Sequence, residues 1–125
     1  MCKEITLSPL GRTWIFDLDG TLVKHNGYKD EGHDTLLAGV KTFFENIPND
    51  DLVVIITARK RETAAQTEEF LRQNGIRFDT IIYNAPYGER ILVNDAKPSG
   101  LQMAIAVNTE RDHFMEERFT VDPKL

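Results

Sequence analysis

The sequence predicts a doubly wound α/β fold, with a mostly parallel sheet of about five strands and helices on both faces. Short apolar runs alternate with amphipathic helical patterns along the chain, and several of the apolar runs end in polar residues. Right-handed crossovers between parallel strands place helices against such a sheet. The 125 residues fit one domain spanning 1–125, with a core at about 13–108 and a polar tail at about 110–125.

The expected strands are the β-rich or continuously apolar runs. They are 13–16 (TWIF), 51–57 (DLVVIIT), 79–84 (DTIIYN) and 90–95 (RILVND). Residues 101–108 (LQMAIAVN) fit either a helix or a strand, and their β-branched residues favour a fifth strand at the sheet edge.

Two helices are expected between these strands. The first has apolar residues at helical spacing, at Leu36, Leu37, Val40, Phe43, Phe44 and Ile47. The second spans 61–73 and stops at Asn74-Gly75. Between the first strand and the first helix, Asn26-Gly27 is a hairpin-turn signal, so a small hairpin is expected at 24–34. In the tail, Phe114, Met115 and Phe119 are the residues able to dock on the body.

Composition excludes several classes of protein. A 41% hydrophobic and 28% charged chain is globular rather than disordered. No apolar run approaches the roughly 20 residues of a membrane helix, and no signal peptide is apparent. The lone Cys2 has no partner for an internal disulfide, so the cytoplasm is the expected compartment. The net charge of −5 disfavours a nucleic-acid binder.

Three of the apolar runs deliver polar groups to one edge of the expected sheet. The first ends in Asp17, the second in Thr57 and the fourth in Asn94-Asp95. Ligands bind beyond the carboxyl ends of the strands in such sheets, so these groups predict a site.

Converging carboxylates indicate a hard divalent cation, and Mg²⁺ is the expected ion. An aspartate at a strand end, such as Asp17, can attack phosphorus directly and form an acyl phosphate that water then hydrolyses. Asp19, two residues on, can serve as general acid and then as general base. Thr57 and Lys97 are candidates for neutralising and binding the phosphoryl group.

Three motifs in this order resemble those of the haloacid dehalogenase superfamily. They are FDLDGTLV (16–23), VVIITAR (53–59) and ILVNDAKP (91–98). The resemblance implies a Rossmann-like fold and a phosphatase in which Asp17 is the nucleophile and a Mg²⁺ ligand. It further implies that Asp19 is the acid/base and binds the metal through its backbone carbonyl, Thr57 binds the phosphoryl group, and Asp95 is a metal carboxylate. Asp19 also disfavours dehalogenase chemistry, since it marks the phosphotransferases of that superfamily.

The chain departs from the family pattern in two places. The third motif, a Lys or Arg, has no clean match; Lys97 is the first choice, with Lys60, Arg61 and Arg90 in reserve. A second acid of the last motif is missing, since Asn94 precedes Asp95 and Ser99 lies four residues after it. Additional substrate-contact candidates are Gly20, Thr21, Ala58, Arg59, His25 and Asn94.

Structural roles compete with these assignments at several positions. Thr57 fits a helix cap, Lys97 a solvated lysine and Gly20 a sharp chain reversal. His25 fits a site residue and a structural residue equally well.

The segments at 24–34 and 84–89 are too short for the lid domain that many members carry, so the chain resembles the capless phosphatases. Small capless members often act on sugar phosphates of capsule or lipopolysaccharide synthesis. A small phosphorylated metabolite is therefore the expected substrate, with no nucleic-acid or membrane partner, and a homo-oligomer is left open. The alternatives are a phosphatase of a macromolecule, such as a nucleic-acid end or a phosphoprotein, and a non-catalytic interaction module.

Overall fold

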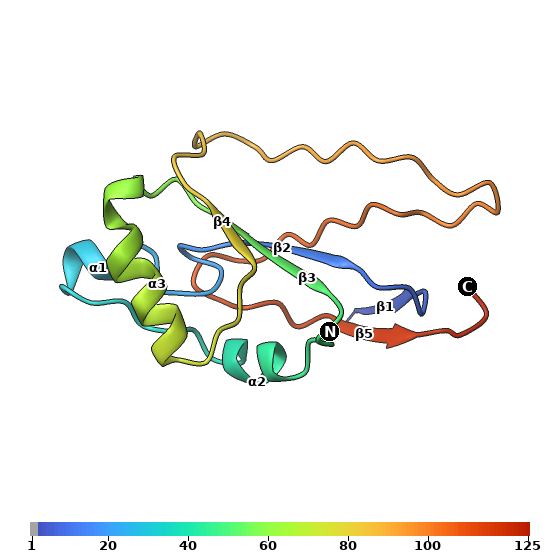
Figure 1. Ribbon diagram of the computed structural model, residues 1–125, viewed down its shortest axis with the longest axis horizontal. Helices are drawn as coiled ribbons and strands as arrows, with labels where there is room; N and C mark the ends of the chain where they lie inside the picture. Colours follow the sequence, from blue (N-terminus) through green and yellow to red (C-terminus); the bar gives the residue numbers. More distant parts are fainter. Residues whose placement is uncertain (1–2) are drawn as a thin grey trace.

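The computed structural model describes residues 3–125, so the predicted free thiol of Cys2 lies outside the described residues. The chain is α/β and contains two small parallel sheets (Figure 1). The larger sheet has the order β2 (Thr13–Asp17), β3 (Leu52–Ile56), β4 (Thr80–Ile82). The smaller joins β1 (Glu4–Leu7) to β5 (Arg118–Val121). No lid domain is found in the described part of the chain, as predicted.

The three-stranded sheet is built from consecutive strands in parallel register. Asp17 at the end of β2 lies opposite Ile56, and Ile56 in turn lies opposite Ile82 of β4. The strand order follows the chain order without reversal. Right-handed crossovers between strands in this order place the connecting helices on one face of the sheet.

The helices are α1 (Gly27–Asp30), α2 (Val40–Glu45), the 3₁₀ turn η1 (Arg61–Thr63) and α3 (Ala64–Gln73). Both predicted helices are confirmed in shorter form. The first begins only at Val40 because Gly39 has a left-handed backbone, with φ 89°. The second ends where predicted, at Asn74 followed by Gly75, whose φ is 71°.

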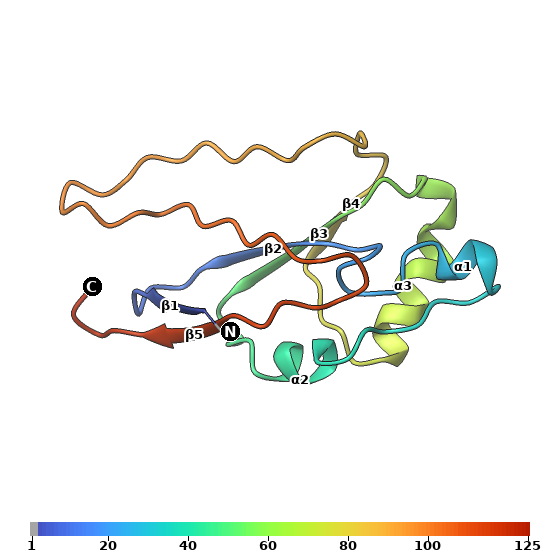
Figure 2. The same ribbon diagram turned by 180° about the vertical axis from the view of Figure 1, so that it is seen from behind.

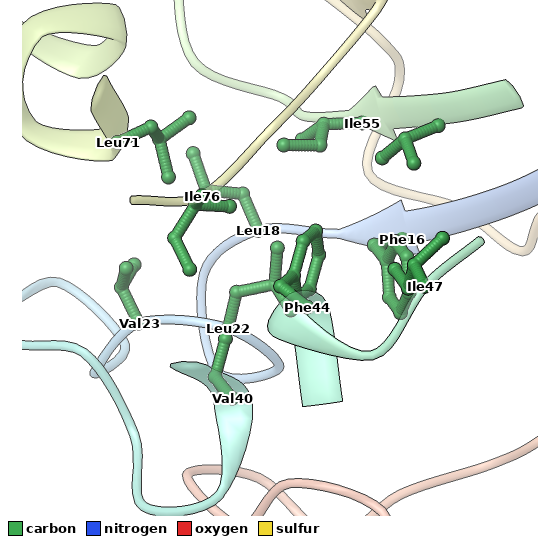
Figure 3. Packing of buried hydrophobic residues seen from close by; sticks show 11 residues of the cluster. Phe16, Leu18, Leu22, Val23, Val40, Phe44, Ile47, Ile55, Leu71 and Ile76 are labelled. Atoms are coloured by element: carbon green, nitrogen blue, oxygen red, sulfur yellow. The ribbon is translucent and has the colours of Figure 1, made fainter. Parts of the chain in front are cut away.

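One face of the larger sheet carries the hydrophobic core (Figure 3). Phe16 of β2 and Ile55 of β3 pack there with Phe44 of α2 and Leu71 of α3. Burial of aliphatic and aromatic side chains of this size is the main stabilising contribution to a fold of this kind. Helices α2 and α3 therefore cover the same face of the sheet.

The prediction of a single doubly wound sheet of about five strands is wrong in its finer detail. Five strands are present in the described residues, but they form two sheets. Helices on both faces require the strand order to reverse at β2, and β2 is instead an edge strand. On the uncovered face, Ile15, Leu52 and Ile82 are about half exposed.

The predicted strands at 90–95 and 101–108 are wrong. Both fall in a long irregular segment, residues 86–108, which we call the arm. It extends from the carboxyl end of β4 and returns toward β5 (Figures 1 and 2). A turn closes its tip, where Gly100 N–H donates to Lys97 O at 2.8 Å and Lys97 N–H to Leu101 O at 2.9 Å. The apolar runs have strand propensity, but in the described structure they pair with no strand.

The C-terminal tail docks on the body, as its aromatic residues indicated. Phe119 in β5 packs edge-on against Trp14 at 5.1 Å, and Phe114 packs against Phe43 at 5.5 Å. Met115 also contacts the core. These side chains bury apolar surface against β2 and α2 and so hold the polar tail to the body.

The segment 24–34 forms the short helix α1 rather than the predicted hairpin. Asn26 adopts a left-handed backbone, with φ 56°, but it precedes a helical turn instead of joining two strands. No helix in the described residues combines the length and the apolarity needed to cross a bilayer.

Candidate functional site

The acidic motif lies at the carboxyl edge of the larger sheet. Asp17 is the last residue of β2, and the chain turns sharply after it. Gly20 has φ 85°, a conformation that favours glycine, so its role in chain reversal is supported. The Thr21 hydroxyl donates to Asp17 Oδ2 at 3.0 Å. This turn brings the carboxylates of Asp17 and Asp19 to one pocket.

The pocket has a volume of about 250 Å³. Its lining is polar and comes from two distant segments, Asp17, Asp19, Gly20 and Thr21 from the β2 loop and Thr109 and Arg111 from the C-terminal part of the chain. The backbone links these segments, since Asp112 N–H donates to Gly20 O at 2.8 Å. Sequence reasoning missed Thr109 and Arg111, because nothing in their local sequence shows that the tail returns to the β2 loop.

Asp17 has a cationic partner. Arg90 Nη1 donates to Asp17 Oδ1 at 3.1 Å, and both side chains are partly exposed (36% and 39%). Arg90 was one of the reserve candidates for the missing third motif. It places a positive charge beside the predicted nucleophile without burying either group.

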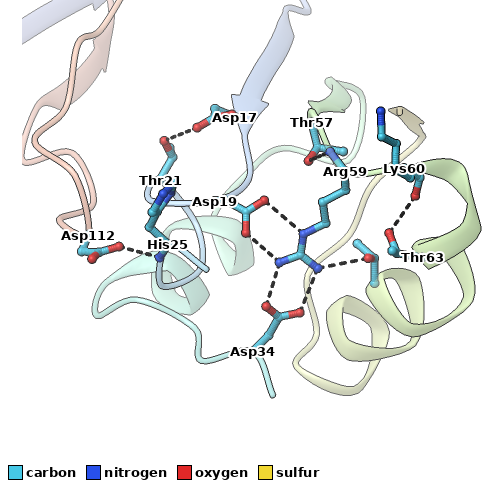
Figure 4. Close-up of polar contacts among 11 residues, drawn as sticks. Asp17, Asp19, Thr21, His25, Asp34, Thr57, Arg59, Lys60, Thr63 and Asp112 are labelled. Atoms are coloured by element: carbon cyan, nitrogen blue, oxygen red, sulfur yellow. Dashed lines mark hydrogen bonds and ion pairs between the residues drawn. The ribbon is translucent and has the colours of Figure 1, made fainter. Parts of the chain in front are cut away.

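Asp19 is held by a buried guanidinium (Figure 4). Arg59 donates to both of its carboxylate oxygens, at 3.0 and 2.8 Å. The same guanidinium donates to both oxygens of Asp34, at 3.0 and 2.7 Å. Bidentate contacts of this kind fix both position and orientation. Sequence reasoning missed Asp34, which lies in a loop with no motif around it.

The surroundings of Arg59 complete its hydrogen bonding. Its Nη1 also donates to the Thr67 hydroxyl at 3.1 Å, and its guanidinium lies 4.1 Å from the centre of the Tyr28 ring. Burial by itself would lower the pKa of Arg59, but the hydrogen bonds to Asp19 and Asp34 outweigh it and the net direction is upward. The guanidinium is thus committed to these partners rather than to a substrate.

Thr57 follows β3 and is buried, with 1% of its surface exposed. Its hydroxyl oxygen accepts a hydrogen bond from Arg59 N–H at 3.1 Å, a contact within the turn after β3. The expected helix cap is wrong, because Lys60 and Thr63 are the residues that precede η1 and α3. Neither Thr57 nor the neighbouring Ala58 lines the pocket. In this structure, Thr57 therefore stabilises the turn that places Arg59 beside Asp19.

His25 contributes its backbone to the site's frame. Its N–H donates to Asp112 Oδ1 at 2.7 Å, so the carboxylate ties the β2 loop to the C-terminal segment (Figure 4). The imidazole is not part of the pocket lining.

Asn94, Asp95 and Lys97 lie on the arm and are not part of the pocket lining. The Asn94 side chain donates to the Asp95 backbone carbonyl at 3.0 Å. Among residues 3–125, no three His, Cys, Asp or Glu side chains form a group able to hold a metal ion. One chain in this conformation therefore brings together Asp17 and Asp19 of the predicted Mg²⁺ ligands but does not add Asp95, so the complete set does not fit.

Comparisons with protein-family models, curated proteins and solved structures return no match to this chain. The assignment of a function accordingly depends on the sequence motifs and on the geometry of the pocket.

Proposed function

We propose that the chain is a phosphomonoesterase of the haloacid dehalogenase type that passes through an aspartyl-phosphate intermediate. The observation that carries the proposal is the shared pocket of Asp17, Asp19 and Thr21 at the carboxyl edge of a parallel sheet. Two carboxylates with different partners in one pocket suit a nucleophile and a separate acid/base.

In the first step, an Asp17 carboxylate oxygen attacks the phosphorus of the ester. The bond from phosphorus to the leaving oxygen breaks, and Asp19 gives that oxygen a proton. In the second step, Asp19 takes a proton from water, which attacks the phosphorus of the intermediate. Inorganic phosphate leaves and the Asp17 carboxylate is restored. The Thr21 hydroxyl, 3.0 Å from Asp17 Oδ2, orients the nucleophile.

The acid/base role of Asp19 requires one of its oxygens to leave Arg59. Asp34 supports this movement, because it keeps two hydrogen bonds to the same guanidinium. The buried positive charge then keeps a carboxylate partner while Asp19 transfers a proton. Asp34 is by this argument a positioning residue for Asp19.

Two arginines supply positive charge to the pocket. Arg90 contacts Asp17, and Arg111 lines the pocket from the opposite segment. Phosphoryl transfer requires mainly positioning and neutralisation of charge on the transferred group. We assign charge compensation at the nucleophile to Arg90 and substrate phosphate binding to Arg111. Lys97, the first choice from sequence, is placed on the arm.

The proposed substrate is a small sugar phosphate, of the kind used in capsule or lipopolysaccharide synthesis, and the proposed compartment is the cytoplasm. A pocket of about 250 Å³ suits a phosphate and part of a sugar. Mg²⁺ is the proposed ion, and a single chain does not complete its carboxylate set.

The test is hydrolysis of an aryl phosphate and of a panel of sugar phosphates with Mg²⁺ and with EDTA. We expect phosphatase activity that EDTA removes and added Mg²⁺ restores. The Asp17→Asn variant should be inactive, with a thermal unfolding midpoint near that of the parent chain. Asp50→Asn, at an exposed acid outside the pocket, is the matched control and is expected to keep full activity.

The competing functions predict other outcomes. If the enzyme hydrolyses phosphorylated oligonucleotides or phosphopeptides but not sugar phosphates, it is a phosphatase of macromolecules. Absence of turnover on every substrate, together with absence of Mg²⁺ and vanadate binding by calorimetry, would overturn the enzymatic assignment and support a non-catalytic module.

A further inference from the structure

The arm and one edge of β2 both lack a strand partner in the described structure. In the described structure β2 is hydrogen-bonded to β3 on one side and to no strand on the other. Edge strands present unpaired N–H and C=O groups that accept an additional strand. The edge strand ends at Asp17, so whatever pairs with it reaches the pocket.

The arm exposes apolar side chains that a folded chain ordinarily covers. Ile91 is 85% exposed and Val93 88%. Leu92, Met103 and Ile105 are about half exposed. Residues 86–108 number about 23, close to the 20–30 residues that each partner contributes to a stable interface. The arm is therefore large enough to hold a second protein chain in place.

The arm also matches the free edge of β2 in sequence. Residues 91–95 (ILVND) and 13–17 (TWIFD) are both five-residue segments that contain three consecutive apolar residues and end in aspartate. If the two segments paired in parallel register, Val93 would lie opposite Ile15 and Asp95 opposite Asp17. Side chains alternate between the faces of a strand, so Ile91 and Val93 would lie with Ile15 on the face that the helices leave uncovered.

The arm of the same chain runs in the wrong direction for this pairing. Its outgoing limb, which contains Asp95, runs opposite to β2 in both views (Figures 1 and 2). It thus carries Asp95 away from the carboxyl edge where Asp17 lies. A limb from another molecule is free of this constraint.

We propose that the arm of a second copy of this chain adds to the free edge of β2 as a parallel strand and places its Asp95 beside Asp17. The pocket, which one chain supplies with two carboxylates, gains the third from the partner. Charge is matched as well, because Lys97 follows Asp95 and approaches an edge that holds Asp17 and Asp19. The carboxylate role of Asp95 depends on the proposed function, whereas the strand pairing does not.

Cysteine cross-linking tests the pairing without reference to activity. In a Cys2→Ser background, one chain carries Ile15→Cys and a differently tagged chain carries Val93→Cys. Opposed residues of paired strands lie within disulfide range. We expect a covalent dimer of the two tagged chains on mild oxidation. The control replaces Val93→Cys by Tyr87→Cys, which is 87% exposed but outside the paired run, and is expected to give little dimer.

A doubly substituted chain, with both Ile15→Cys and Val93→Cys, distinguishes the alternatives. Cross-links within one chain, without dimers between the singly substituted chains, would show that the arm folds back on its own sheet and would overturn the proposal. A chain that sediments as a monomer at all concentrations would overturn it as well. Neither outcome would affect the roles proposed for Asp17 and Asp19.

Mixed oligomers test the shared site. Asp17→Asn and Asp95→Asn chains are each expected to be inactive alone. Co-expressed in equal amounts, they are expected to regain about a quarter of the parent activity, since half of the pairs are mixed and one site in each is complete. An active parent enzyme with no regain in the mixture would refute the shared site alone. An inactive parent enzyme would instead refute the proposed function.

Discussion

At the scale of single residues, the pair of carboxylates on Arg59 is the feature with the most direct consequences. Arg59 and Asp34 have side chains only 3% and 8% exposed, so their ion pair is shielded from water. Removing one member of a buried pair leaves the other charge uncompensated and costs about 3–5 kcal/mol. Asp19 then becomes the one carboxylate that holds the guanidinium.

We therefore predict that Asp34→Ala lowers the free energy of unfolding by about 3 kcal/mol. It should also lower kcat with little change in KM, because Asp19 must leave an uncompensated arginine to transfer its proton. Urea unfolding and steady-state kinetics measure the two effects. Glu31→Gln, which removes the exposed pair with Lys24, is the control and should change neither. A folded Asp34→Ala enzyme with parental kcat would contradict the positioning role.

Arg111 is the second residue with a specific expectation. It lines the pocket opposite the nucleophile loop, and its side chain lies 3.4 Å from the position of a Cβ on Gly20. If it binds the substrate phosphate, Arg111→Gln should raise KM about tenfold, equivalent to about 1.4 kcal/mol, with a smaller change in kcat. Arg111→Lys should recover part of the loss. Arg118→Gln, on β5 and outside the pocket, is the matched control; an equal rise in its KM would argue against the assignment.

Among the residues that line the pocket, the sequence predicted those that are close together along the chain. Asp17, Asp19 and Thr21 share one loop, so their proximity follows from local geometry. Asp34, Thr109 and Arg111 reach the site through tertiary packing, and single-sequence patterns carry no signal for that. Arg59 was identified as a candidate for substrate contact. Its role as partner of Asp19 depends on how the fold brings the two side chains together, and the sequence spacing does not predict that contact.

At the scale of elements, the hydrogen bond from Tyr83 to Glu68 joins the end of β4 to α3. The hydroxyl donates to Glu68 Oε2 at 2.8 Å, and Tyr83 is 7% exposed. Burial raises the pKa of Tyr83, and the hydrogen bond to Glu68 raises it further. Ionisation would place a buried phenolate beside a carboxylate.

Because the folded-state pKa is above the unfolded value, this contact stabilises fully below pH 10 and is lost as pH rises beyond it. We predict that the free energy of unfolding of the parent chain falls more steeply above pH 10 than that of Tyr83→Phe. Urea titrations between pH 8 and about 11 measure both slopes, and the other titrating groups cancel in the difference. Parallel slopes would show that Tyr83 is not linked to stability in this way.

Strands and helices were predicted correctly where a segment had the matching residue pattern and also packed against the rest of the fold. β2, β3, β4 and α3 follow the apolar patterns closely, because each packs on the core of Phe16, Ile55 and Leu71. The runs at 90–95 and 101–108 have comparable character but no pairing partner in the described chain. Strand propensity reflects how well a side chain packs on a sheet surface. An apolar run with no neighbouring strand therefore does not form a strand.

At the scale of the whole molecule, the sheet is incomplete at one edge and uncovered on one face. Consecutive strand order places both crossover helices on the Phe16 face, and Ile15, Leu52 and Ile82 are left half exposed opposite. A strand added at β2 extends the sheet on the side where the predicted order would have reversed. With that proposed strand in place, two chains would approach the fold class predicted from sequence more closely than one chain does.

The proposed pairing predicts that catalysis depends on association. If the partner's Asp95 completes the site, the specific activity per chain should fall on dilution below the dissociation constant of the pair. Assays from micromolar to nanomolar enzyme, alongside sedimentation at the same concentrations, measure both quantities. The disulfide-linked dimer from the Ile15→Cys and Val93→Cys chains is the control, and its specific activity should stay constant because its chains cannot separate. Constant specific activity of the unlinked chain across a range in which it dissociates would contradict the shared site, since a separated chain would then be competent alone.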